Sequence, residues 1–168
     1  MFQHSLKNII IGLVAGGILA SCSLLPNVPV WLKRVDFEVD PQANRGTSFV
    51  CHITVAYSQD LLEKLKGMND AKVYFEQVEA LKKTYKDSIE IFKFDMIPGR
   101  NQLNRPITLR SYTKAKGAFI FAKYTTPGKY MENIGLAKTL TVNFLPNKME
   151  LHSDINLEQL TSQLNIGK

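Results

Sequence analysis

Apolar and polar residues alternate along several short stretches of the chain, which is the pattern of a β-strand with one buried face. The stretches at 30–40 and 48–57 are separated by turn-forming residues, which indicates an antiparallel hairpin with a long connection. In the second stretch His52 and Thr54 lie opposite the apolar face, so His52 is predicted to be a surface residue or an exposed contact. Similar patterns predict further strands at 88–97, 105–112, 117–124, 136–145 and 148–152.

Helical spacing replaces this alternation between the second and third strands. Apolar residues recur at helical intervals from Ser58 to Gly67, and again from Asn69 or Asp70 to about Tyr85. Residues suited to N-caps precede both stretches, and the first turns of the second stretch are also compatible with a strand. We therefore expect a mainly β protein, a small antiparallel β-sandwich with a helical insertion after the second strand.

The N-terminus has a different pattern. One charged residue, Lys7, precedes an apolar run at 9–19, and small residues then lead to Cys22. This pattern is typical of a secretory signal, and the run is shorter than the roughly 20 residues that a membrane-spanning helix needs. The chain then divides into an N-terminal signal helix that is removed (1–21), a tether with two prolines (22–29), a β-sandwich domain (30–153) and a tail or short helix (154–168).

The net charge is mildly basic and spread along the chain. Lys and Arg number 21 against 15 Asp and Glu, a formal net charge of +6 at pH 7. There is no arginine-rich block, so nucleic acid is not expected as a partner, whereas an anionic membrane or an acidic protein suits this charge. Trp31 is either a core residue or a residue of the membrane interface. Lys114 and Lys116 either keep a turn solvated or contact acidic lipid.

The sequence contains no motif for common catalytic or cofactor chemistry. It has no glycine-rich phosphate loop, Cys-x-x-Cys, His-Glu-x-x-His or Gly-x-Ser-x-Gly. We therefore predict no catalytic residue, no metal and no cofactor. Cys51 lies on an apolar strand face and is interpreted as an inert core thiol. Three acidic residues have a spacing that permits calcium binding, but a solvated strand face is the favoured interpretation for Asp36, Glu38 and Asp40.

The four residues that end at Cys22 resemble the box before the lipidated cysteine of bacterial lipoproteins. The resemblance implies cleavage before Cys22 and attachment of acyl chains, such as palmitate, to this residue. Ser23, rather than an aspartate, follows the cysteine, which by the sorting habit of such lipoproteins implies the periplasmic face of the outer membrane. The alternatives are an ordinary cleavage site with a cysteine nearby and an uncleaved signal anchor.

The order of features along the mature chain resembles the TssJ family, the small outer-membrane lipoprotein of the type VI secretion apparatus. The features are the lipoprotein box, an Asn-Arg-Gly loop between the first two strands, and a later strand that ends at a Pro-Gly turn (98–99). The resemblance implies a transthyretin-like β-sandwich that is not an enzyme. It also implies that the loop 41–47 binds the periplasmic C-terminal part of the inner-membrane subunit TssM, through Gln42, Asn44, Arg45 and Gly46.

Two other classes of function stay open. One is a different envelope adaptor, such as a pilotin or a type IV secretion lipoprotein, and the other is a periplasmic ligand-binding lipoprotein. A ligand binder needs an apolar pocket lined by a few convergent polar groups, whereas an adaptor needs a filled core and an accessible loop or edge. A hydrolase is disfavoured because the chain offers no set of nucleophile and base.

Overall fold

The computed structural model describes residues 30–154, so the predictions for the signal peptide, the tether and nearly all of the tail lie outside the described residues. Within this range the loop between the first two strands contains a short 3-10 helix, η1. The elements are β1 (Arg34–Val39), η1 (Ala43–Gly46), β2 (Phe49–Ala56), α1 (Gln59–Lys66), α2 (Ala71–Thr84), β3 (Ile89–Met96), β4 (Gln102–Pro106), β5 (Gly117–Ala122), β6 (Met131–Asn133), β7 (Thr139–Phe144) and β8 (Met149–Ser153).

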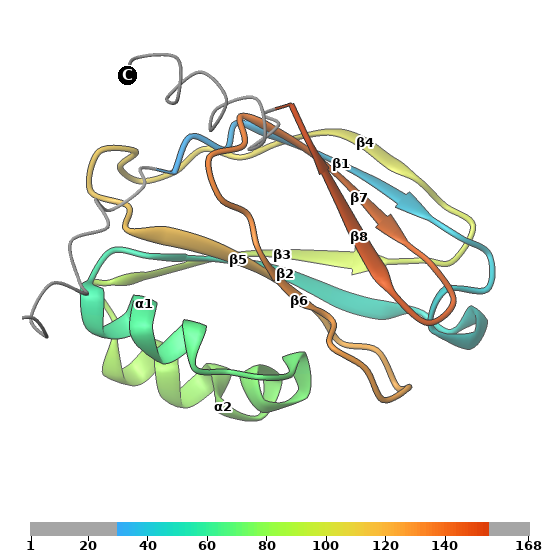
Figure 1. Cartoon of the computed structure of the whole chain (residues 1–168), viewed down its shortest axis with the longest axis horizontal. Coiled ribbons are helices and arrows are strands. Elements are labelled where there is room, and N and C mark those ends of the chain that lie inside the picture. The colour runs from blue at the N-terminus through green and yellow to red at the C-terminus, as the bar shows by residue number, and fades with distance from the viewer. Residues whose placement is uncertain (1–29, 155–168) are drawn as a thin grey trace, which may run out of the picture.

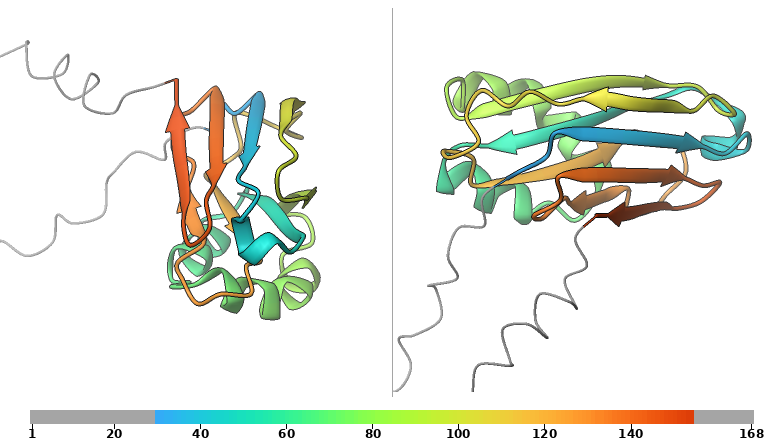
Figure 2. Two further views of the ribbon diagram at one scale, coloured as in Figure 1. Left: turned by 90° about the vertical axis from the view of Figure 1, so that its right-hand side faces the viewer. Right: turned by 90° about the horizontal axis from the view of Figure 1, so that it is seen from above.

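The strands form two four-stranded sheets, ordered β4-β1-β7-β8 and β3-β2-β5-β6. The sheets face each other, and α1 and α2 cover the outer side of the second sheet (Figures 1 and 2). The expected mainly β sandwich with a helical insertion after its second strand is confirmed. The strand pairs are antiparallel except that β1 pairs with β7 in parallel, which the long path between these two strands allows.

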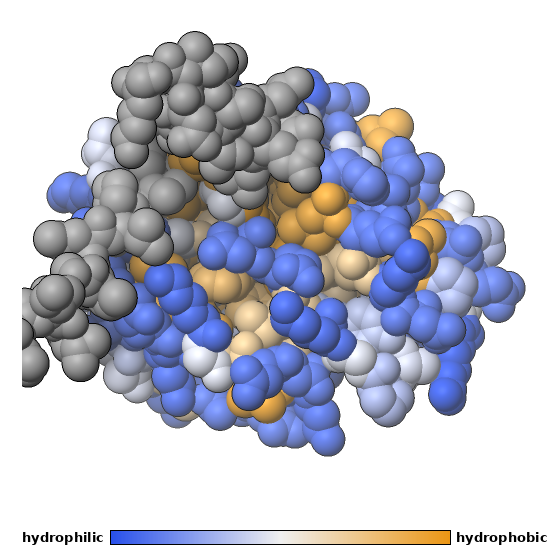
Figure 3. Space-filling model, in the orientation of Figure 1, coloured by the Kyte–Doolittle hydropathy of each residue, from blue (hydrophilic) through white to orange (hydrophobic). Residues whose placement is uncertain are grey.

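The core lies between the sheets and uses the alternation visible in the sequence. In β1 the side chains of Val35, Phe37 and Val39 are buried. The ring centroid of Phe37 lies 4.9 Å from that of Phe94 in β3 and 5.9 Å from that of Phe144 in β7. Aromatic contacts therefore join β1 to the opposite sheet as well as to its neighbour in the same sheet. On the side of the molecule drawn in Figure 3, apolar residues show in the middle and hydrophilic residues surround them.

Both helices begin at capped residues. Ser58 Oγ accepts a hydrogen bond from Leu61 N at 3.3 Å, and Asp70 Oδ1 accepts one from Lys72 N at 3.0 Å, which satisfies backbone donors of the first turns. The second stretch is helical from its first turn, so the strand alternative for that part is wrong. Neither of these helices has the length and apolar character required to cross a bilayer.

The hairpin expected between the first two strands is wrong, because β1 and β2 belong to different sheets and do not pair. One further strand prediction was wrong, and one strand was missed. The strand expected at 105–112 is β4, which ends at Pro106, a residue without a backbone N–H to donate to a neighbouring strand. Ile107 and Leu109 are buried beyond the end of this strand, which explains the alternation that suggested a strand there. The short strand β6 was not predicted, because three residues are too few for a periodic pattern.

Candidate functional site

The loop between β1 and β2 has an unusual backbone. Asn44, Arg45 and Gly46 are consecutive and all have positive φ angles, of 49°, 57° and 71°. Glycine adopts this region freely and asparagine tolerates it, whereas arginine does so at a cost in free energy. Three backbone hydrogen bonds close the loop on itself, from Ala43 N to Asp40 O, from Arg45 N to Gln42 O and from Thr47 N to Asn44 O.

Asn44 holds this loop from the inside. Its side chain is fully buried, and its Oδ1 accepts hydrogen bonds from Thr125 N at 2.6 Å and Thr125 Oγ1 at 2.9 Å. Its Nδ2 donates to Thr47 O at 3.0 Å. Asn44 was predicted to contact a partner, but a buried side chain with these bonds positions the loop instead. The side chain ties the β1–β2 loop to the loop after β5.

The exposed part of the loop is polar and basic. Gln42, Arg45 and Gly46 are all solvent-exposed, and among the described residues the guanidinium of Arg45 has no ion-pair partner within 4.0 Å. Each of these residues is therefore available for an external contact. An acidic or hydrogen-bonding surface is the kind of partner that this loop suits.

The Pro-Gly turn after β3 supports the same loop. Gly99 N donates to Val39 O at 3.0 Å, at the end of β1. Gly99 has a φ of 75°, a conformation that favours glycine, and a Cβ on it would lie 3.7 Å from a side-chain atom of Pro41. The two turns that carried the resemblance in the sequence are therefore neighbours in space.

Cys51, Asp36 and Asp40 make contacts within the domain. Cys51 is buried, and burial raises the pKa of its thiol well above the ordinary range, as expected for an inert core thiol. Asp36 Oδ1 accepts a hydrogen bond from Asn104 N, and Asp40 Oδ1 accepts one from Gln42 N. Within residues 30–154, no cluster of His, Cys, Asp or Glu side chains has the geometry of a metal site.

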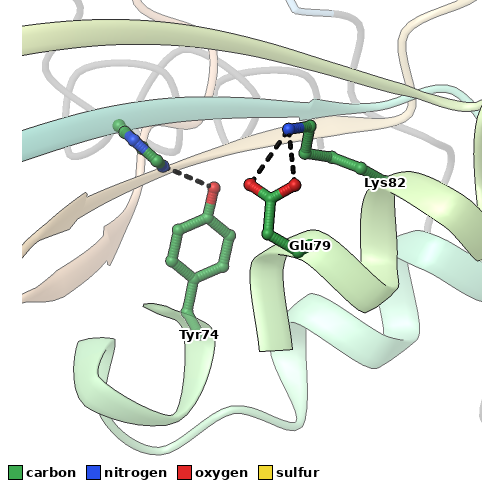
Figure 4. A network of polar contacts seen from close by, with 4 residues as sticks. Tyr74, Glu79 and Lys82 are labelled. Atoms are coloured by element: carbon green, nitrogen blue, oxygen red, sulfur yellow. Dashed lines mark hydrogen bonds and ion pairs between the residues drawn. The ribbon is translucent and has the colours of Figure 1, made fainter. Parts of the chain in front are cut away.

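His52 is buried, contrary to its predicted place at the surface. Only 5% of the residue is exposed, because α2 covers the outer face of β2. The Tyr74 hydroxyl lies 3.0 Å from His52 Nδ1 and 2.7 Å from Thr54 Oγ1, and Figure 4 shows Tyr74 reaching from α2 to the first of these contacts. The ring of Phe75 packs at 4.9 Å from the imidazole. The adjacent pair of aromatic residues in α2 was the signal that a helix would cover this strand.

The surroundings of His52 favour its neutral form. Burial is the largest cause that lowers the pKa of His52, from 6.5 to about 4, and the positive charges of Lys93, Lys82 and Lys123 act in the same direction. Glu79 acts in the opposite direction, and this carboxylate is paired with Lys82 at 2.8 Å (Figure 4). A neutral imidazole can accept a hydrogen bond from the Tyr74 hydroxyl at Nδ1, so the hydrogen bond and the lowered pKa of His52 agree.

Folding stability is expected to decrease as the pH falls from 6.5 to about 4. Over this range the unfolded chain binds a proton at His52 that the folded chain does not, and above it the contribution is complete and constant. The expected loss is about 1–3 kcal/mol in the free energy of unfolding. Urea unfolding of the wild type and His52→Gln across this range measures it, because carboxylate titration is common to both. Identical pH slopes in the two proteins would contradict the prediction.

Comparisons with known proteins were made for the sequence and for the fold. No family model and no curated protein matches the sequence. Among solved structures, the chain is similar to the type VI secretion lipoprotein TssJ1 from Pseudomonas aeruginosa, with a TM-score of 0.58 and 11% identity over 76% of this chain and 98% of that chain. The chain has a TssJ-like fold.

Two further structures support this result. The Lip protein of Serratia marcescens, described as a membrane-bound component of the type VI secretion system, matches with a TM-score of 0.57 and 13% identity over 77% of this chain and 100% of that chain. A structure described as the TssM C-terminal domain (869–1107) from EAEC contains a match with a TM-score of 0.50 and 14% identity over 71% of this chain and 96% of that chain. The similarity to this chain therefore extends over nearly the whole length of each matched chain.

Proposed function

We propose that this protein is an outer-membrane lipoprotein that anchors a trans-envelope secretion complex of type VI kind. In this proposal acyl chains on Cys22 hold it on the periplasmic face of the outer membrane. Its β1–β2 loop binds the periplasmic domain of an inner-membrane subunit similar to TssM. The observation that carries the proposal is the TssJ-like fold, which covers 98% of a named type VI lipoprotein.

Two independent features support lipid anchoring. The lipoprotein box directly precedes Cys22, at the end of an apolar run that suits an export signal. Structures with this fold are described as a lipoprotein and as a membrane-bound component. More than one acyl chain makes such anchoring stable, since each buried methylene contributes about 0.8 kcal/mol.

The geometry of the domain supports partner binding by the loop. β1 runs along the sandwich from the end where the described chain begins, at Val30, to the opposite end, where η1 lies (Figures 1 and 2). A domain held by its N-terminus therefore presents Gln42 and Arg45 at the end farther from the anchor. A match within a structure described as a TssM domain supports a partner of that type.

The proposed role requires no chemical reaction. The described domain uses its buried polar side chains for internal hydrogen bonds, as at Asn44 and at His52 with Thr54. The similar structures are named as secretion components and lipoproteins. We therefore propose a binding and anchoring protein rather than an enzyme.

A capture experiment tests this function. The mature chain, from Cys22 onward, is immobilised and exposed to detergent-solubilised envelope of the source organism, and the captured proteins are identified by mass spectrometry. The expected result is a large inner-membrane protein with a periplasmic C-terminal domain. The double variant Gln42→Ala with Arg45→Ala is the control and is expected to capture less of it. Recovery of a secretin or pilus component instead would favour the pilotin or type IV alternative.

A further inference from the structure

The end of the sandwich that receives the N-terminal tether carries exposed lysines. Lys33, Lys114 and Lys138 are exposed, and within residues 30–154 none of them has an ion-pair partner within 4.0 Å. The helical layer differs, because several of its lysines are paired with glutamates one turn away, as Lys66 is with Glu63 at 3.1 Å. The lysines at the tether end are therefore available to an external anionic surface.

Backbone hydrogen bonds place these lysines at one end of the domain. Lys33 N donates to Lys138 O at 2.9 Å, and Ile107 N donates to Lys33 O at 2.9 Å. The hydroxyl of Tyr112, two residues before Lys114, donates to Ile107 O at 3.2 Å. Lys33, Lys138 and Ile107 thus lie beside the start of β1, and the segment 107–116 continues around the same end of the sandwich (Figure 1).

Asp154, an acidic residue at this end, is hydrogen-bonded to the backbone. Asp154 Oδ1 accepts hydrogen bonds from the backbone N–H groups of Lys138 and Thr139, at 3.0 and 3.2 Å. The carboxylate thus satisfies the start of β7 and does not neutralise a lysine ammonium group.

Trp31 stands in the same region and is 40% exposed, although its neighbours Val30 and Leu32 are buried. Tryptophan is enriched at membrane–water interfaces, where its ring lies at the level of the headgroups. Only seven residues, 23–29, separate Cys22 from Val30. Even fully extended, this stretch spans at most about 29 Å, so a lipid on Cys22 keeps the tether end near the bilayer.

We propose that the tether end is a membrane-contact face that binds the headgroups of anionic phospholipids through Lys33, Lys114 and Lys138, with Trp31 at the interface. The proposal rests on the proposed lipid anchor, because the anchor brings this face to the bilayer. Each lysine near the surface then raises the constant for binding to the anionic membrane about five-fold. Contact at this end fixes the orientation of the domain, so the β1–β2 loop faces away from the membrane.

Trp31 is the single tryptophan of the chain, so its fluorescence reports on this face directly. The mature chain is coupled through Cys22 to a maleimide phospholipid in vesicles, and the burial of Cys51 directs the reaction to Cys22. Vesicles containing phosphatidylglycerol are compared with purely zwitterionic phosphatidylcholine vesicles. On the anionic vesicles we expect a blue shift of the Trp31 emission and an about twofold reduction in its quenching by acrylamide. Raising the salt to 1 M should reverse both changes.

Two variants with equal charge change complete the test. The triple variant Lys33→Gln, Lys114→Gln and Lys138→Gln should lose the protection of Trp31 on anionic vesicles. The matched triple variant Lys64→Gln, Lys72→Gln and Lys83→Gln, on the helices, should keep it. Equal quenching of the wild type on both kinds of vesicle would overturn the proposal, and so would an equal effect of the two triple variants. Chemical coupling supplies the anchor here, so this outcome is separate from a failure of natural lipidation.

Discussion

Replacing Cys22 with serine is expected to move the protein from the membrane fraction to the soluble periplasmic fraction. The variant cannot carry acyl chains on a thiol, and a membrane anchor of two acyl chains is worth about 0.8 kcal/mol for each buried methylene, which no surface contact replaces. The lysines at the tether end act over about a Debye length of 8 Å at physiological salt, so they orient a domain already at the membrane and do not hold it there. Cell fractionation with immunodetection measures the distribution of the protein between membrane and soluble fractions. Secretion should be lost together with the membrane attachment.

The folding of the domain serves as the control for this result. Residue 22 lies outside the described domain, whose core begins at Val30, so the variant should unfold at the same urea concentration as the wild type. A membrane-bound Cys22→Ser protein would indicate an uncleaved signal anchor rather than a lipoprotein. Secretion that continued with fully soluble protein would contradict the anchoring role itself.

Replacing Asn44 with alanine should both destabilise the domain and weaken partner binding. The change removes three hydrogen bonds of a buried side chain and places a residue with a Cβ but no polar group at a φ of 49°. Unpaired Thr125 and Thr47 groups, together with the left-handed backbone, should cost about 2–4 kcal/mol in the free energy of unfolding. Urea unfolding measures this cost, and calorimetry with the captured partner measures the affinity, which should fall at least about tenfold because the loop is no longer held in one conformation.

The exposed loop residues provide the comparison. Arg45→Ala changes a surface side chain with a positive φ of its own, so its stability should stay within about 0.5 kcal/mol of the wild type. If the loop binds the partner, this variant should still reduce affinity, while an Asn44→Asp variant that keeps the acceptor for Thr125 should be less unstable than Asn44→Ala. Normal affinity in both the Asn44→Ala and Arg45→Ala variants would place the binding surface elsewhere.

Features that depend on residues close together in the sequence were predicted correctly, whereas features that depend on contacts between distant segments were not. Alternation in β1 and the cap at Ser58 depend on neighbours within a few residues and were predicted at their places, and the cap at Asp70 was one of the two residues predicted. The failures depended on contacts between distant segments. His52 was assigned to the surface because nothing in its own strand indicates that Tyr74, 22 residues away, would cover it. Asn44 was assigned to a partner because its bond to Thr125, 81 residues away, leaves no local pattern.

The sequence by itself determined that the chain is mainly β with a helical insertion, that its thiol at Cys51 is buried, and that a polar loop at 41–47 joins the first two strands. These properties follow from the spacing of apolar side chains at strand and helix periods, and this spacing can be seen within a single segment of the sequence. Only the tertiary structure decided which residues of that loop are accessible, that β1 and β7 pair in parallel, and that lysines distant in sequence lie at one end of the described domain. A hydrogen bond or a charged face between remote segments depends on how the layers pack, and periodicity within one segment carries no record of that packing.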